Sequence, residues 1–104
     1  EVTVTARLRL PDGKTRAILG TIDRLVIEPD RILAVDYKSN RMIPDRPEST
    51  PEGLLRQLGA YALALSQIYP DRRIETAILW TRTGQLMPFH PDIVSAALAR
   101  TTIA

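Results

Sequence analysis

A helical segment flanked on both sides by strand-like runs is the feature that most limits how this chain can fold. Thr50 is a natural N-cap, Pro51 suits the first helical position, and the segment ends at Tyr69, before a proline. Its apolar side chains repeat at helical spacing: Leu54, Leu55, Leu58, Tyr61, Ala62, Leu65 and Ile68. Because a helix between two strands lets them lie side by side in parallel, this order predicts an α/β fold with a helical crossover.

Alternating apolar and polar residues predict strands before this helix. The first run covers residues 2–10, and the turn-forming residues 11–14 follow it. The second run covers 15–27 and the third 32–38, with another turn at 28–30 between them. Three strands joined by two short turns predict an antiparallel meander.

The rest of the chain is expected to add a loop, further strands and a second helix. Residues 39–51 lose periodicity and contain three prolines, which predicts a loop. Residues 74–81 return to a strand pattern, and 84–89 are expected to add a short strand. Residues 91–100 predict a terminal helix. The fourth strand is free to lie beside the third, across the helical crossover.

Composition excludes several classes of protein. The chain has 104 residues, enough for one domain with one modest core. It has no cysteine, which excludes disulfide frameworks, thiolate zinc sites, iron–sulfur clusters and cysteine nucleophiles. No apolar run approaches the roughly 20 residues of a membrane span, and the first residues lack the pattern of a signal peptide. We therefore expect a soluble, intracellular domain that is a fragment of a longer chain.

The charged residues are compatible with nucleic acid as a partner. Lys and Arg number 14 against 12 acidic residues, and all but two of the basic residues are Arg, which forks onto phosphate. Most of these Arg residues are explained equally well as solvated surface charges. No glycine-rich phosphate loop is present, so any use of ATP must lie outside these residues.

Two acidic residues stand where strands should be apolar. Asp23 interrupts the second run and Asp36 the third, and burying an unpaired carboxylate is costly. Lys38 follows Asp36 by two residues in the same strand and therefore lies on the same face. A hairpin centred between positions 29 and 30 places Asp23 opposite Asp36, so two carboxylates and one ammonium converge. That set suits a hard divalent cation such as Mg²⁺.

A purely structural interpretation of these charges is also open. In it, Asp36 and Lys38 form an exposed pair, and Asp23 pairs with Arg24 or Arg7. The acid-x-Lys triplet alone is weak evidence, because such a triplet readily arises by chance. The second acid, in register on the neighbouring strand, favours the metal site.

Three segments resemble, in order and spacing, the nuclease motifs of the RecB-like branch of the PD-(D/E)XK superfamily. They are Gly20-Thr21-Ile22-Asp23-Arg24-Leu25, Val35-Asp36-Tyr37-Lys38-Ser39 and Gln57-Leu58-Gly59-Ala60-Tyr61-Ala62. Within this branch the chain is most similar to the C-terminal nuclease domains of AddA-type subunits of bacterial helicase–nucleases. The resemblance covers nearly the whole chain. It implies a restriction-endonuclease-like core, an α/β fold whose small mixed sheet, made of the meander and the crossover strand, is flanked by helices.

The resemblance implies roles for the residues of the second and third strands. Asp23 and Asp36 would hold Mg²⁺, for which Mn²⁺ would substitute, and the backbone carbonyl of Tyr37 would be a further ligand. Lys38 would position and polarise the attacking water and stabilise charge on the phosphate in the transition state.

It also implies supporting residues outside those strands. Gln57 and Tyr61 lie four apart on the helix, and in the family that face looks onto the active site and contacts DNA. The structural alternative is a core tyrosine and a polar residue on the helix surface. Apart from the resemblance, three arginines lie next to the proposed site or in the loop after Lys38, where they would grip the phosphate backbone of DNA: Arg24, Arg41 and Arg46.

One part of the family pattern has no counterpart here. The family usually has a histidine metal ligand on a helix upstream of the first strand, and His90 comes too late in the sequence to take that role. We expect His90 in a loop. Glu1 corresponds to a further acidic position of the family.

The implied function is Mg²⁺-dependent hydrolysis of DNA, on single strands delivered by a helicase motor in the rest of a longer chain. Residues 1–104 would then be the nuclease domain of an enzyme that processes double-strand breaks for recombinational repair. It would act in the bacterial cytoplasm, at the nucleoid, with an AddB-like second subunit. One alternative is a non-catalytic DNA-binding or docking module, and another is a nuclease of a CRISPR or phage system. Related nucleases of the latter kind commonly have a cysteine-ligated cluster, which this chain cannot form.

Overall fold

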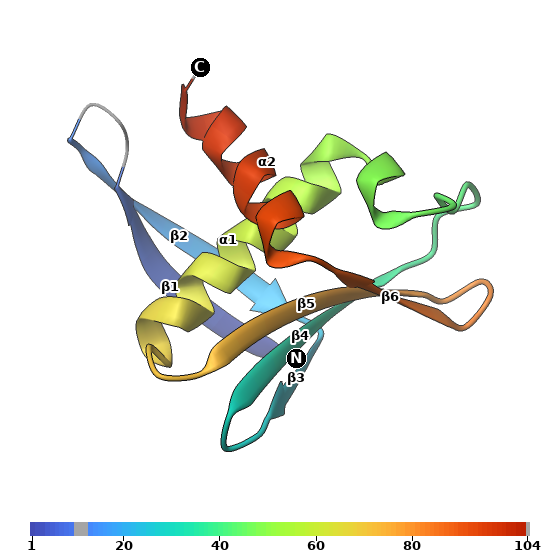
Figure 1. Ribbon diagram of the computed structural model, residues 1–104, viewed down its shortest axis with the longest axis horizontal. Helices are drawn as coiled ribbons and strands as arrows, with labels where there is room; N and C mark the ends of the chain where they lie inside the picture. The colour runs from blue at the N-terminus through green and yellow to red at the C-terminus, as the bar shows by residue number, and fades with distance from the viewer. Residues whose placement is uncertain (10–12, 104) are drawn as a thin grey trace.

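Two sheets and two helices make up the part of the chain that the structure describes, residues 1–9 and 13–103 of a computed structural model (Figure 1). The strands are β1 (Val2–Arg9), β2 (Thr15–Ile22), β3 (Arg24–Ile27), β4 (Arg31–Lys38), β5 (Arg73–Trp80) and β6 (Gln85–Phe89). The helices are α1 (Glu52–Ile68) and α2 (Pro91–Ile103), and a 3-10 turn, η1, spans Pro47–Ser49 in the predicted loop. The predicted strand end at residue 10 and the turn residues 11 and 12 lie outside the described residues.

The predicted three-stranded meander is wrong in one respect: the run 15–27 forms two strands that belong to two sheets. Within the described strands, β2 pairs with β1 alone, whereas β3 joins a four-stranded sheet of order β3-β4-β5-β6. The break falls at Asp23, which lies in a bend between β2 and β3. The β3–β4 ladder ends next to this bend. There the Tyr37 amide N–H of β4 donates to the Asp23 carboxylate, which takes the place of a carbonyl of a paired strand.

The helical crossover is confirmed. β4 and β5 run parallel, in register from Arg31↔Arg73 to Lys38↔Trp80, and α1 lies between them in the sequence. β6 then pairs antiparallel with β5 after a tight turn. Gly84 in this turn has a φ of 72°, a left-handed conformation that favours glycine.

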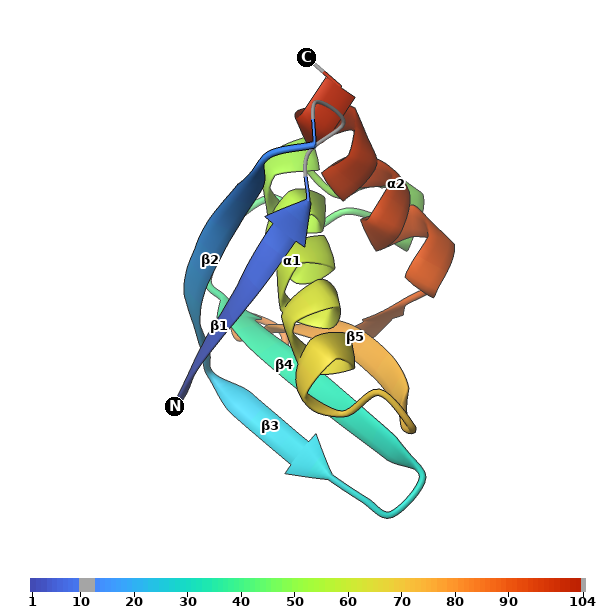
Figure 2. The same ribbon diagram turned by 90° about the vertical axis from the view of Figure 1, so that its left-hand side faces the viewer.

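Helix α1 lies in the angle between the two sheets, and α2 packs against another side of α1 (Figure 2). Gly59 allows the two helices to approach closely, since a Cβ at this position would collide with the carbonyl oxygen of Val94. Of the helices in the described ranges, neither is long and apolar enough to cross a membrane. The core around α1 includes Val4, Ile22, Ile32, Ala34, Leu55, Leu58, Tyr61, Leu65, Ile78 and Trp80.

The start of α1 differs from the prediction, because Thr50 does not cap it. The amide of Thr50 donates to the Pro47 carbonyl at 3.1 Å and closes η1, and its hydroxyl is buried without a hydrogen-bond partner in the described part of the chain. Pro51 takes the N-cap position, where its carbonyl accepts from Leu54 and Leu55. The 3-10 turn thus fixes Thr50 before the helix begins.

Candidate active site

The two acidic residues lie opposite each other where the four-stranded sheet meets β2. Arg24 pairs with Val35 and Leu25 with Ala34, so the next position outward sets Asp23 against Asp36. This is the register that the sequence predicts for the hairpin. The bend at Asp23 turns the chain out of this sheet, and Asp36 remains inside β4.

Each carboxylate has one cationic or backbone partner with a short contact. The Tyr37 amide N–H donates to Asp23 Oδ2 at 2.8 Å. Lys38 Nζ lies 3.1 Å from Asp36 Oδ2, in an ion pair on the face of β4 that looks toward α1. Asp36 is 4% exposed, whereas Asp23 and Lys38 are half-buried. The sheet therefore brings two carboxylates and one ammonium together.

The pKa values of the two carboxyl groups shift in opposite directions. Burial raises the pKa of Asp36 to about 6, and a hydrogen bond shared with Asp23 and the negative charge of Asp23 add to this rise. The same hydrogen bond lowers the pKa of Asp23, and the Tyr37 amide and the Lys38 ammonium lower it further. In the absence of a cation, the buried acid thus retains a proton to mildly acidic pH while the outer one is ionised.

The structure differs from the purely structural interpretation in two details. Asp36 is buried, so it does not form an exposed pair with Lys38. Among the described ion pairs, none joins Asp23 to Arg24 or Arg7. The backbone of Arg7 instead exchanges two hydrogen bonds with the Gln67 side chain on α1.

Helix α1 contributes Gln57 and Tyr61, and Tyr61 is the core residue that the structural alternative predicts. Its ring is in the core at 5% exposure, and its hydroxyl donates to the Thr21 carbonyl at 2.8 Å. Burial raises the pKa of Tyr61, and the negative charges of Asp36 and Asp23 raise it further, which places the hydroxyl near both acids. A hydrogen bond joins Tyr61 to Gln57.

Among the described ion pairs, none joins an arginine or the histidine to either of the two acids. Arg24 and Arg41 are exposed, and Arg46 is 4.0 Å from Glu48. His90 is exposed and lies in the link before α2, as predicted. Its Nδ1 accepts a hydrogen bond from the Asp92 amide in the first turn of α2.

Two supporting residues were not predicted from the sequence. Thr81 donates both its amide (2.8 Å) and its hydroxyl (3.2 Å) to the carbonyl of Lys38, which holds the end of β4. The parallel register, in which Lys38 pairs with Trp80, is the feature that could have indicated Thr81. Gly20 lies against the Tyr61 ring. It belongs to the motif that contains Asp23, but the sequence predicted no role for Gly20 itself.

The donor set fits a hard divalent cation. Asp36 Oδ2 is buried, and Lys38 Nζ lies 3.1 Å from it. Two facing carboxylates thus have one ammonium between them. Within the residues that the structure describes, no group of three or more His, Cys, Asp or Glu gathers anywhere. Mg²⁺ is commonly held by one or two carboxylates with substrate phosphates and keeps several waters, so a pair of carboxylates matches the number of protein ligands it takes.

Comparison with known proteins identifies the fold family. A family model described as the PD-(D/E)XK nuclease superfamily matches residues 1–99, nearly the whole chain. No curated protein and no solved structure gives a significant match. The mixed α/β arrangement described above is consistent with the restriction-endonuclease-like fold of that superfamily.

Proposed function

Because this chain belongs to the PD-(D/E)XK nuclease superfamily, we propose that it hydrolyses the phosphodiester bonds of DNA with Mg²⁺ as cofactor. Nucleases of this superfamily generally use divalent metal ions. The single observation that carries the proposal is the pair of facing carboxylates, one of them buried, beside Lys38. A fold that only docked to a partner would have no use for this arrangement, because a buried acid held with too few donors costs stability.

Each residue of the site has a proposed role. Asp23 and Asp36 would hold the cation, together with the backbone carbonyl of Tyr37. When bound, Mg²⁺ supplies charge stabilisation at the phosphate and a more acidic water. The Lys38 ammonium, fixed by Asp36, donates hydrogen bonds to the attacking water and to the phosphate oxygens and so orients the one against the other.

The surroundings of the site suit a polyanionic substrate. Arg24 directly follows Asp23, Arg41 lies three residues beyond Lys38, and both are exposed. Contacts of this kind bind the phosphate backbone without reading base sequence, and they weaken as salt rises. We therefore propose that these two arginines supply affinity for DNA.

The finer assignment is to an AddA-like helicase–nuclease. The order and spacing of the three motifs around Asp23, Asp36 and Gln57 support it. In this proposal the domain cuts single strands that an ATP-driven helicase motor releases from double-strand ends, and an AddB-like subunit is its partner. It would act in the bacterial cytoplasm during recombinational repair.

A cleavage assay tests the proposal. Replacing Lys38 by Ala should lower Mg²⁺-dependent cleavage of single-stranded DNA by about 10²–10³-fold, because an oriented charge at the transition state is lost. Lys14→Ala, in the β1–β2 hairpin, removes the same charge elsewhere and should retain cleavage at saturating DNA. Equal cleavage by the Lys38 variant, or cleavage by neither protein, would contradict the proposal and favour a docking module. In an enzyme with its motor, Lys38→Ala should abolish cutting and spare unwinding.

A further inference from the structure

Tyr61 contacts two consecutive residues of β2 that come shortly before Asp23. Its hydroxyl donates to the carbonyl of Thr21 at 2.8 Å. Its ring covers Gly20, where a Cβ would lie 2.6 Å from Cε1 and 3.4 Å from Cδ1 of Tyr61. Real Cβ atoms are not found at 2.6 Å from a ring carbon, so any larger residue at position 20 would displace the tyrosine.

These contacts hold β2 where it has no second neighbouring strand. Thr21 pairs with Thr3 of β1, and across the described strands β2 has no other partner. On its other side β2 faces no strand of the described part of the chain, and there the Tyr61 hydroxyl donates a hydrogen bond to the Thr21 carbonyl. Ile22 follows, fully buried, and the chain then bends at Asp23 into the other sheet.

The position of Asp23 relative to Asp36 depends on how the two sheets are held together. Asp36 belongs to the four-stranded sheet, and Asp23 is the first residue after the two-stranded one. Helix α1 packs on β1, β2, β4 and β5, and it passes between the sheets (Figure 2). Tyr61 is therefore one side chain through which α1 holds the strand that leads into the first acid, and its hydroxyl makes a hydrogen bond to that strand.

We propose that the contact of Tyr61 with Gly20 and Thr21, named here the Tyr61 clamp, positions the Asp23 carboxylate against Asp36. Tyr61 is then a positioning residue, and its 5% exposure leaves little of its surface for DNA. This inference rests on the proposed function, since the spacing of the two carboxylates matters to a cation site. Groups that orient metal-binding side chains in this way commonly affect metal affinity by 10- to 100-fold.

The first test uses no metal and replaces Tyr61 by Phe, which removes the hydroxyl and keeps the ring over Gly20. The amide of Tyr37 donates to Asp23 Oδ2 and therefore reports where that carboxylate lies. We expect hydrogen exchange at the Tyr37 amide to become several-fold faster, while the amide of Ile78 in the buried β5 strand exchanges as before. Unchanged exchange at Tyr37 would overturn the proposal.

The second test measures Mn²⁺ affinity and cleavage together. In Tyr61→Phe, Mn²⁺ affinity should fall about tenfold, high metal should restore the cleavage rate, and the KM for DNA should not change. A raised KM for DNA with unchanged Mn²⁺ affinity would overturn the proposal in favour of a DNA contact. Tyr69→Phe, at the far end of α1, is the matched control and should change neither quantity. If the wild-type protein binds no Mn²⁺, the proposed function fails, and exchange at Tyr37 still decides whether the clamp exists.

A pair of size changes tests the steric half of the Tyr61 clamp. Gly20→Ala should lower the melting temperature by several degrees, because its Cβ displaces the Tyr61 ring. Adding Tyr61→Leu makes room for that Cβ, so the double variant should lose less than the sum of the two single variants. Additive losses would show that the two positions do not touch, and they would overturn this part of the proposal.

Discussion

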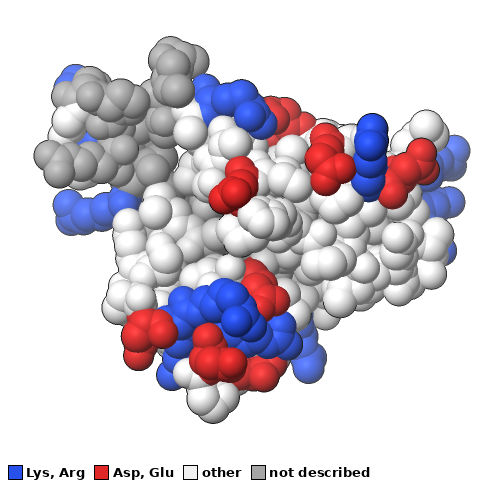
Figure 3. All heavy atoms as spheres, in the orientation of Figure 1, with Lys and Arg blue, Asp and Glu red and all other residues white. Residues whose placement is uncertain are grey.

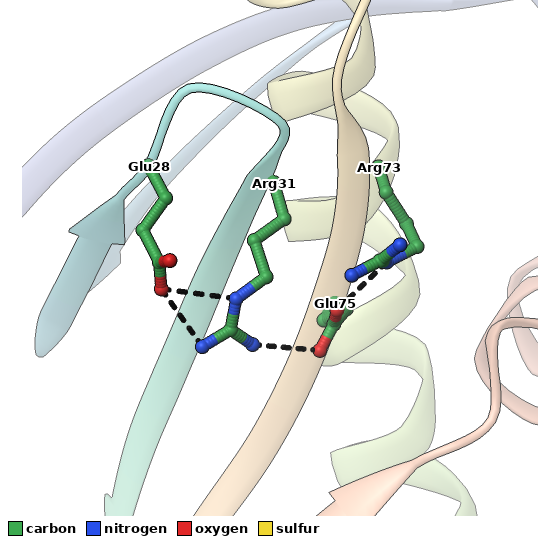
Figure 4. A network of polar contacts seen from close by, with 4 residues as sticks. All are labelled: Glu28, Arg31, Arg73 and Glu75. Carbon is green, nitrogen blue, oxygen red and sulfur yellow. Dashed lines mark hydrogen bonds and ion pairs between the residues drawn. The ribbon is translucent and has the colours of Figure 1, made fainter.

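The two ends of strands β4 and β5 both gather charged side chains, yet they are built in opposite ways. At the amino ends, Arg31 binds Glu28 and Glu75 at 2.8 and 3.0 Å, and Arg73 binds Glu75 at 2.9 Å (Figure 4). Two arginines balance two glutamates there. Figure 3 shows basic and acidic side chains intermixed in one group at the lower edge of the molecule. At the carboxyl ends, Asp36 and Asp23 share Lys38 as their nearby cationic side chain, and Asp36 is buried.

The difference appears in the acidity of the carboxyl groups. Hydrogen bonds from Arg73 and the charge of Arg31 lower the pKa of Glu75, so the folded chain stabilises the ionised form of this acid. Burial and the neighbouring acid raise the pKa of Asp36 to about 6. A balanced network of this kind is structural, whereas an acidic pair short of positive charge indicates a place where a cation binds.

The largest expected effect is the difference in cleavage rate between two variants, each of which lacks one acid at one end of the sheet. Asp36→Asn should reduce Mg²⁺-dependent cleavage of DNA to background, because one of the two carboxylates that hold the cation is gone. Glu75→Gln, in the same sheet, should leave the cleavage rate unchanged. Both are measured at saturating DNA and metal. Comparable losses of cleavage in the two variants would contradict a specific role of Asp36 in holding the cation.

The stability of the metal-free protein should fall as pH rises from about 5 to 6.5. The native state retains a proton on Asp36 in this window while the unfolded chain has lost it, so folding is favoured on the acidic side. The shift from 3.8 to about 6 corresponds to about 1–3 kcal/mol once solvent screening is allowed for. Three acids with lowered pKa values contribute in the opposite sense, and mostly below this window: Glu75, Glu52 and Asp23.

Urea unfolding at several pH values measures this effect. Asp36→Asn removes the titrating group, so its stability should be nearly flat between pH 5 and 6.5. The variant should also be more stable than the wild type above pH 6.5 in the absence of metal. A wild-type curve that rises with pH across this window would contradict the assigned environment of Asp36.

The smallest effect is expected at the balanced network. Glu75→Gln removes two ion pairs at the surface, each worth about 0.2–1 kcal/mol, and its effect should shrink with added salt. Thermal unfolding at low and high salt measures it. A loss that is large and independent of salt would show that Glu75 is a buried structural acid instead.

Much of the site was predictable because the relevant rules are local. A turn at 28–30 fixes the register that sets Asp23 against Asp36, and spacing by two fixes the face shared by Asp36 and Lys38. The helical crossover follows from the order of the elements. The family motifs, in order, identify the superfamily.

The parts that the sequence did not reveal depend on competition between distant groups. Strand-forming residues continue on both sides of Asp23, so nothing local shows that its carboxylate takes the Tyr37 amide and ends a sheet there. Thr50 looks like a cap, but a 3-10 turn uses its amide first. Thr81 reaches the carbonyl of Lys38 only once the parallel pairing is formed.

A calorimetric titration with Mn²⁺ shows whether the unbalanced acidic pair, Asp23 and Asp36, is a cation site. The wild-type protein and Glu75→Gln should bind Mn²⁺ saturably at one site with the same affinity, and Asp36→Asn should lose that binding. Because the wild-type site must give up the proton of Asp36, its affinity should also rise between pH 5 and 7. Equal binding by all three proteins, or no binding by the wild type, would contradict the account.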